Sequence, residues 1–393
     1  MLSSAWLTRP RPALPTALLL GAGFLVAADN RVPAPLLPAI AGDLDVSIGA
    51  AGLTVAVYSL AYALGQVFYG PLGDRVGKVQ VIRTMVMLFA LASMLCAAAP
   101  SYPALLGLRL LTGLAAAAII PMSLAHLGDT VAGYGERQAA IGVFLSVIVS
   151  GQVLGQAVGG VLAGLLSWRA IFVVTGALGL ALAAAIWACA APPAPAATRA
   201  PEPRGGVFRA FRAILAADRP LFLVVTGETF LFLGTFPFAA SALIEEHHAS
   251  YALTGVLTAS FAVGSVGASR LLPRLAPHAG DAPRFRAGAA VMAVGFALLA
   301  TTPGAALFGV AVLVFGVGFT LAHSTLQART TEVSPAARGT AVSLFAGLAN
   351  VGAAAGTFAA AALIDALGFG AAFAAAALGL LVLAAVAPAA LAR

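Results

Sequence analysis

Charged residues are scarce in this chain. Only 9% of its 393 residues are Asp, Glu, Lys or Arg, whereas 61% are hydrophobic, and the mean hydropathy is +1.01. Soluble domains use about 45–50% apolar residues. The polar residues present here are too few to cover the surface of even a large globule. The composition therefore excludes a soluble globular domain and predicts a membrane protein.

Cysteine and lysine are almost absent. Cys96 and Cys189 lie in apolar surroundings without a CxxC pattern or a histidine-rich neighbour, which excludes a disulfide framework and a zinc site. The only lysine, Lys78, is followed by Val79, so the P-loop pattern is missing and we expect no bound ATP. The patterns H-E-x-x-H and G-x-S-x-G are also missing, so we expect no enzyme. We predict no cofactor and no metal.

Twelve apolar runs are long enough to cross a bilayer, for which a helix needs about 20 residues. Lipid offers the backbone no hydrogen-bond partners, and runs of this length without period-two alternation predict helices. The first run resembles a signal peptide, but it resumes through Pro33–Ala41, so we expect it to remain as a spanning helix. We therefore predict an all-α membrane protein with transmembrane helices at about 13–41, 47–72, 79–99, 103–128, 137–164, 168–191, 220–244, 251–273, 285–302, 304–327, 338–364 and 368–391.

The basic residues predict the orientation. Of the 21 Lys and Arg, all except Arg31, Arg109 and Arg169 fall at the termini or in the even-numbered loops between runs. That bias places both termini in the cytoplasm of a multi-pass protein of the cell (cytoplasmic) membrane. The net charge of +7 indicates no nucleic-acid partner, because the basic residues are scattered rather than gathered on one face. The opposite loops carry acids, namely Asp43, Asp45, Glu245, Glu246 and Asp365.

The stretch 192–219 divides the runs six and six, so we expect bundles at 1–191 and 220–393. Within it an amphipathic helix on the inner membrane surface and a disordered linker are both open; the helix would bury Phe208, Phe211, Ile214 and Leu215. An internal repeat supports the division, because shifting residues 137–172 by 201 onto 338–373 matches 9 of 36 positions. Alanine-rich segments match one another by chance, so the matches of Arg, Gly and Phe are the better evidence for the repeat. Two parallel six-helix halves are typical of transporters.

The loop after the second run carries a motif, Gly70-Pro-Leu-Gly-Asp74-Arg75-Val-Gly77-Lys78. It resembles the G-x-L-x-D-R-x-G-R/K motif of the major facilitator superfamily, and the twelve runs extend that resemblance over essentially the whole chain. Glycines there permit close helix approach, and Asp74 with Arg75 can form a charged latch at the cytoplasmic mouth. A simple positive-inside turn is the alternative, but it does not explain Asp74. A copy without the acid follows at 267–274.

Two further patterns resemble the superfamily. Arg109-Leu-Leu-Thr-Gly113 is similar to its R-x-x-x-G pattern in the fourth helix. The spacing of the glycines in the fifth run resembles that of the proton-coupled drug antiporters in this superfamily, although Gln156 replaces the expected proline. The resemblance implies export, while close packing of any membrane helix is the alternative. The glycines concerned are Gly142, Gly151, Gly155, Gly159 and Gly160.

The first run is interrupted by Asp29-Asn30-Arg31 near the middle of the membrane. A charge there costs about 2.5–3.5 kcal/mol on insertion scales, so we expect Asp29 to face a wet chamber inside the bundle. Arg109 reaches a similar depth and can pair with it. Superfamily exporters use such a pair as a proton-responsive unit, and this resemblance implies proton coupling by Asp29. A purely structural ion pair and contact with the substrate are the alternative roles. Arg31 either extends outward or lines the cavity.

Other polar groups in the apolar runs are candidate site residues. Glu228 is a second acid for protons or substrate, or a structural residue satisfied by Ser or Thr. His323 titrates near neutral pH unless packing satisfies it. His247 and His248 are read as loop residues rather than metal ligands. Neutral groups suited to a cavity for amphiphilic molecules are Tyr58, Tyr62, Gln66, Gln152, Gln156 and Asn350.

These observations predict a secondary active transporter that exports small amphiphilic compounds, drug-like or metabolite, in exchange for protons by alternating access. An uptake symporter for sugars or organic anions is the alternative, favoured by the arginines and opposed by the glycines. A non-transporting membrane sensor is a further alternative, but the loops leave little room for a sensing domain. The expected partners are the substrate, protons and lipid, and we expect a monomer.

Overall fold

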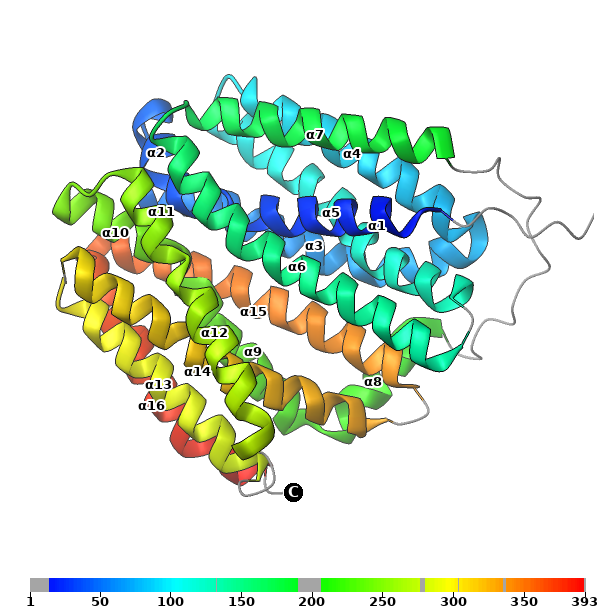
Figure 1. Ribbon diagram of the computed structural model, residues 1–393. Coiled ribbons are helices and arrows are strands. Elements are labelled where there is room, and N and C mark those ends of the chain that lie inside the picture. Colours follow the sequence, from blue (N-terminus) through cyan, green and yellow to red (C-terminus); the bar gives the residue numbers. More distant parts are fainter. Residues whose placement is uncertain are drawn as a thin grey trace, which may run out of the picture.

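Helices make up the fold of this chain. The computed structural model describes residues 14–131, 133–189, 206–275, 280–302, 304–334 and 337–391, and within these ranges no strand occurs (Figure 1). The helices before the central linker are α1 (Thr16–Arg31), the 3-10 helix η1 (Ala34–Leu36), α2 (Leu37–Leu44), α3 (Ile48–Val76), α4 (Lys78–Ala97), α5 (Tyr102–Thr130), α6 (Tyr134–Ala163) and α7 (Trp168–Cys189). The helices after it are α8 (Gly206–Ala217), α9 (Arg219–Thr235), α10 (Pro237–His247), α11 (Tyr251–Thr258), α12 (Ser260–Leu275), α13 (Asp281–Ala300), α14 (Ala305–Val333), α15 (Arg338–Leu367) and α16 (Phe369–Leu391).

The predicted fold class is confirmed. Eleven helices or helix pairs in the described part of the chain are long and apolar enough to cross a membrane. The first predicted span is missing from that count, because α1 ends at Arg31 and the chain continues through η1 into α2. The prediction of one unbroken helix over 13–41 is therefore wrong. Pro33, Pro35 and Pro38 explain the break, since proline lacks the N–H that a continuing helix needs.

The helices pack mainly within two groups. In the first group α1 packs on α6, α3 and α4 on α5, and α4 on α7. In the second, α9 packs on α15, α12 and α13 on α14, and α13 on α16. The groups also meet, since α3 lies along α15 and α6 lies against α11. A ligand between the groups would therefore contact helices from both halves of the sequence.

The two groups are tied together at the end of the molecule that carries α2 and α10 (Figure 1). There α10 packs on η1 and α2. The Asp365 carboxylate at the end of α15 accepts a hydrogen bond of 2.6 Å from the Ser47 hydroxyl and one of 3.1 Å from the Gly49 amide. These bonds join the start of α3 to the opposite group. We call this the tied end.

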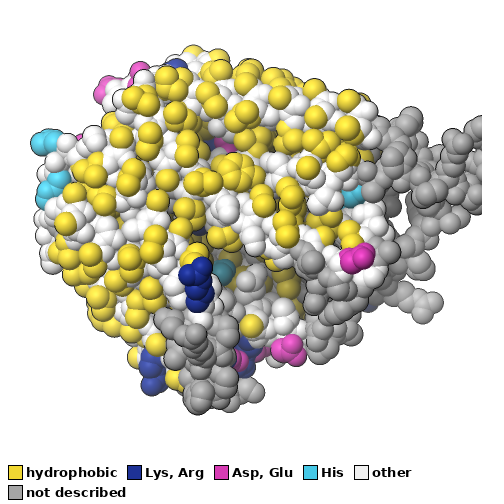
Figure 2. Space-filling model, in the orientation of Figure 1, with side chains coloured by type: hydrophobic (Ala, Val, Ile, Leu, Met, Phe, Trp, Pro, Cys, Tyr) yellow, Lys and Arg dark blue, Asp and Glu magenta, His cyan; other side chains and the backbone are white. Residues whose placement is uncertain are grey.

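The outer surface suits lipid. Hydrophobic side chains are spread over the upper and left parts of the face in Figure 2. Many large apolar side chains are exposed on helices that face away from the core, among them Leu64, Val158, Leu223 and Leu378. Soluble proteins rarely expose apolar surface over such an area. The exposed surface is therefore suited to contact with a bilayer.

A helix forms in the part of the predicted linker that the structure describes. Residues 190–205 lie outside the described residues, but α8 covers 206–217 and packs on α9 and α15. Ile214 is buried against the second group, whereas Leu215 is 37% exposed. The disordered alternative is therefore wrong for α8. Only part of its apolar face turns toward the protein.

Candidate functional site

A buried ion pair connects α1 to α5. The Arg109 guanidinium donates a hydrogen bond of 2.7 Å from Nη1 to Oδ2 of Asp29, and both side chains have 0% exposure. Ser93 on α4 donates a longer bond of 3.4 Å to Oδ1 of Asp29. Asp29 and Arg109, which the sequence predicts at a similar depth in the membrane, are thus in contact.

The surroundings of this pair are aromatic and buried. Arg109 lies over the ring of Tyr58, 4.4 Å from its centre, and 5.6 Å from the centre of the Phe172 ring. Its Nη2 and the Tyr58 hydroxyl are buried without a hydrogen-bond partner. The expectation that Asp29 looks directly into a wet chamber is therefore wrong for this conformation. A proton reaches Asp29 only if this packing opens.

Glycines of α6 bring its backbone against α1 beside the ion pair. A Cβ atom at Gly155 would lie 2.6 Å from Cα and O of Ala28, the residue before Asp29. One at Gly151 would lie 2.6 Å from the Phe24 carbonyl oxygen. Contacts this close exclude any side chain unless the helices move apart. Two of the predicted glycines therefore set how near α6 approaches the helix that carries Asp29.

The remaining glycines of this pattern differ in their surroundings. Gly160 packs across the tied end, where its Cβ would lie 2.6 Å from Cα of Gly255 on α11. Gly159 faces Val32 at ordinary contact distance. Gly142 faces open space on the exposed side of α6, so the alternative of close helix packing does not account for it.

The repeat partners of these glycines make the same kind of contact in the second half. Gly352 on α15 would place a Cβ 2.5 Å from the Thr226 carbonyl oxygen, and Gly356 would place one against Phe230. Thr226 and Phe230 flank Glu228 on α9, as Phe24 and Ala28 precede Asp29 on α1. The internal repeat thus corresponds to glycine packing beside a buried acid in each half.

Glu228 has a basic partner that sequence reasoning missed. Nδ1 of His323 on α14 lies 3.0 Å from Oε2 of Glu228. Glu228 has 0% exposure and the His323 side chain 20%. Oε1 of Glu228 is buried without a partner. The His323 ring stacks on Phe319 with 4.5 Å between ring centres. Each half therefore holds one buried acid paired with a base from a facing helix.

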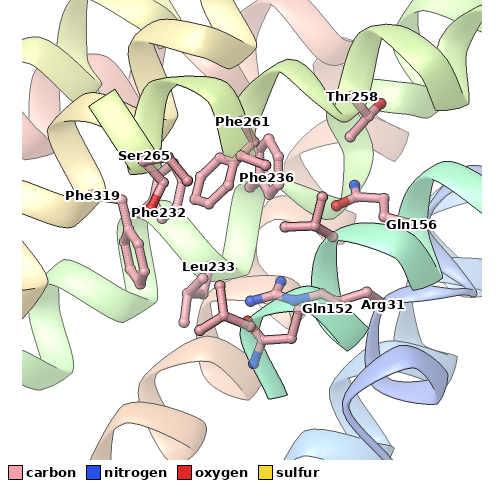
Figure 3. Close-up of a pocket in the computed structure, with 14 residues that line it drawn as sticks. Arg31, Gln152, Gln156, Phe232, Leu233, Phe236, Thr258, Phe261, Ser265 and Phe319 are labelled. Carbon is pink, nitrogen blue, oxygen red and sulfur yellow. The ribbon is translucent and has the colours of Figure 1, made fainter. Parts of the chain in front are cut away.

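A cleft lies between the two groups of helices, close to these pairs (Figure 3). It encloses about 590 Å³, including the open space at its mouth. Its wall comes from α1, α6, α9, α11, α12 and α14 and consists of Arg31, Val149, Gln152, Val153, Gln156, Phe232, Leu233, Phe236, Thr258, Phe261, Ala262, Ser265, Val266 and Phe319.

Three predicted candidates, Arg31, Gln152 and Gln156, line this cleft. Arg31 extends from α1 toward the second half, and Figure 3 shows it directed toward Leu233. The other candidates are not among the residues of this wall. Tyr58 and Tyr62 are buried and stack on each other, Asn350 donates to the Ala346 carbonyl of its own helix, and the Gln66 Oε1 atom is buried without a partner.

Helix breaks position the cleft. Arg31 is the last residue of α1, and Phe236 separates α9 from α10. In both halves a proline follows the break at once, at Pro33 and Pro237. Interrupted helices at matching positions of two repeats mark the substrate site in many transporters, because they free polar backbone groups. The matched prolines are the sequence signal that could have located the cleft.

The predicted latch lies at the junction of α3 and α4. The side chains of Gly70 and Asp74 lie outside the described part, and Arg75 is exposed. Gly77 has φ +99°, a conformation that favours glycine, and it links the two helices without a longer loop. Lys78 forms an ion pair with Asp129 on α5. The motif therefore shapes this junction, and the Asp74 latch remains a prediction.

Comparisons with known proteins agree with this geometry. The family model of the Major Facilitator Superfamily matches residues 19–347. Over 176 residues the chain is 30% identical to the uncharacterized transporter YgaY of Escherichia coli O157:H7, covering 45% of this chain and 44% of that protein. Over 170 residues it is 33% identical to the multidrug efflux pump LfrA of Mycolicibacterium smegmatis, covering 43% of this chain and 32% of that protein. The chain thus spans less than half the length of these two relatives.

The fold also matches a solved structure. A bacterial homologue of the human lysosomal transporter Spinster, in an inward-facing and unoccupied conformation, superposes with a TM-score of 0.78. The match covers 98% of this chain and 96% of that one at 19% identity. At this identity the likeness concerns the fold alone.

Proposed function

Because this chain belongs to the Major Facilitator Superfamily, we propose that it exports small amphiphilic compounds across the cytoplasmic membrane in exchange for protons. The observation that carries the proposal is the packing of glycine-faced α6 against α1 beside the buried Asp29 and Arg109 pair. The same helix continues to Gly160, which contacts the second half at Gly255. Movement between the halves is thereby linked to the surroundings of an ionisable group.

The ion pair supplies a physical means of coupling. Protonating Asp29 in the closed packing leaves the Arg109 charge buried without its partner, which costs about 3–5 kcal/mol. Opening the packing to water removes most of that cost, because water solvates both groups. The halves, residues 1–191 and 220–393, rock about the central cleft, and this motion closes and opens the packing. Asp29 then alternates between a carboxylate paired with Arg109 and a carboxyl group that has accepted a proton. We assign the coupled proton to Asp29. We assign a smaller contribution to proton coupling to Glu228 with His323.

The available energy suffices for export. Moving one charge across about 100 mV yields about 2.3 kcal/mol. At about 1.4 kcal/mol per tenfold, this supports a substrate gradient of roughly fiftyfold.

Two observations support export as the direction of transport. The α6 glycines resemble those of drug antiporters, and LfrA is named a multidrug efflux pump. In addition, the halves are joined at the tied end, where the acid-rich loops lie. The positive-inside pattern assigns that end to the outside. The cleft then loads from the cytoplasm, and the Asp74 latch would act when the halves close there.

Proton-coupled export is tested in proteoliposomes that carry a pH-sensitive dye. A transported amphiphile added to one side should release protons with the parent protein, and Asp29→Asn should still bind the compound but abolish the proton signal. Asp45→Asn, which removes an exposed acid from the turn between α2 and α3, is the matched control and should retain the signal. Full proton release by Asp29→Asn would assign the proton to another group.

The uptake alternative is tested in inverted membrane vesicles energised by respiration. An exporter accumulates the compound inside such vesicles, whereas a symporter does not. Failure to accumulate any compound that the purified protein binds would overturn the exporter assignment.

A further inference from the structure

We propose that the transported compound is an anion whose negative group binds Arg31 and whose aromatic part lies among the phenylalanines of the second half. This inference rests on the proposed transport function and specifies its substrate class. It starts from the charge balance of the cleft and the shape of its apolar wall.

Arg31 is a cation in the cleft without an acid beside it. No acid occurs among the fourteen residues of the cleft wall. Asp29, two residues before Arg31, binds Arg109, and Glu228 contacts His323 through Oε2. Arg31 itself forms no hydrogen bond or ion pair within the described residues. A guanidinium in apolar surroundings is costly unless an anion or several acceptors compensate it.

The position of Arg31 at the end of α1 compensates only part of this charge. The C-terminal end of a helix carries about half a negative charge, which attracts a cation in its last turn. The neutral polar neighbours, Gln152 and Gln156, offer amide oxygens but no charge. A guanidinium presents five donors in a planar fork that matches a carboxylate, sulfonate or phosphate. The Arg31 guanidinium therefore has charge and hydrogen-bond donors that an anion would match.

The opposite wall of the cleft is aromatic. Phe319 is partly exposed to the cleft, and the buried Phe232 behind it lies 5.1 Å from Phe319 and 5.3 Å from the buried Phe236 between ring centres. Phe261 lies 5.6 Å from Phe236 and completes the wall. Figure 3 shows this group facing Arg31 and the two glutamines across the cleft. Aromatic faces bind flat apolar groups, so one molecule with an anionic end and an aromatic body contacts both walls.

Lipophilic cations fit the same space less well. They would place a positive charge near Arg31, with no acid in the wall to offset the repulsion. Aromatic faces alone give about 0.5–2 kcal/mol of cation–π attraction, which does not replace an acid. The cleft thus favours anionic over cationic amphiphiles of equal size.

A matched set of fluorescent probes tests this inference on the intact protein in lipid nanodiscs. Dansylglycine is anionic, dansylglycinamide is its neutral counterpart, and dansylcadaverine is cationic. We expect the parent protein to bind dansylglycine at least about tenfold more tightly than either of the others. Empty nanodiscs measure partition of the probes into lipid. Equal binding of the three probes, or preference for dansylcadaverine, would overturn the inference.

Substitutions locate the binding group. Arg31→Gln should weaken dansylglycine binding roughly 30-fold while changing dansylglycinamide binding less than about twofold. Arg31→Lys retains the charge but loses the planar fork of donors, so it should keep only part of the anion preference. Arg212→Gln removes an exposed cation from α8 and should behave as the parent. If Arg31→Gln fails to fold, the ranking of the three probes by the parent still decides the question.

The outcome is separable from that of the proposed function. Coupled export of dansylcadaverine with no binding of dansylglycine would refute the anion assignment and leave proton-coupled export intact. Anion binding that depends on Arg31, with no proton signal in proteoliposomes, would support the anion assignment and refute proton-coupled export.

Discussion

Replacing Gly155 by alanine should disturb the helix contact that links α6 to the buried acid. The added Cβ would lie 2.6 Å from Cα and O of Ala28 and 2.9 Å from its carbonyl carbon. These are backbone atoms, so no side chain can turn aside, and ordinary contact needs almost 1 Å more separation between α6 and α1. Asp29, the next residue of α1, then shifts relative to Arg109, whose hydrogen bond spans 2.7 Å.

The expected magnitude follows from two opposing terms. Overpacking a tight contact costs about 1–3 kcal/mol, whereas alanine gains about 0.8–1 kcal/mol over glycine in helix propensity. The net effect on unfolding of Gly155→Ala is therefore a loss of up to about 2 kcal/mol. Because the shift occurs beside the ion pair, proton-coupled transport should fall by a larger factor than stability alone explains.

The same helix provides a matched control. Gly142 has nothing within 4 Å of its added Cβ, so Gly142→Ala should gain the propensity term without a clash. Both variants are compared by thermal unfolding in detergent and by the dye assay in proteoliposomes. Equal stability and equal transport in the two variants would refute the reasoning that α6 packing controls the pair.

Three further predictions concern charge and backbone geometry. Asp29→Asn should lower stability by about 3–5 kcal/mol because it strands the buried Arg109 charge; the double variant with Arg109→Gln should recover much of this loss, and a double-mutant cycle by thermal unfolding measures it. His323→Asn removes the ring that contacts the buried Glu228 carboxylate, so the free energy of unfolding should fall by about 1–3 kcal/mol, whereas His247→Asn, whose ring contacts a loop carbonyl, should leave thermal stability nearly unchanged. Gly77→Ala forces an L residue to φ +99° and should cost about 1–2 kcal/mol in unfolding, with unchanged thermal stability contradicting the assigned backbone strain.

The sequence alone predicted much of the fold. Apolar runs of spanning length leave the backbone no partners except its own, so the chain must form helices in lipid. The sequence predicts that Asp29 and Arg109 can pair, because each is a charge at the same depth and few groups at that depth can compensate it. Pro33 and Pro237 mark the helix breaks, yet the apolar runs around them are long enough to predict unbroken spans.

Only the tertiary structure decided which side chains meet. His323 contacts Glu228 although the residues are 95 positions apart in sequence, and Arg31 faces the cleft rather than the outer surface. In a soluble helix the apolar stripe reveals which side turns inward. In these helices apolar side chains occupy every side, because one side faces lipid and the other faces packed helices. Sequence periodicity therefore determined that a segment is helical and how deep a charge lies, whereas the rotation of each helix, and hence every partner across the bundle, depended on packing.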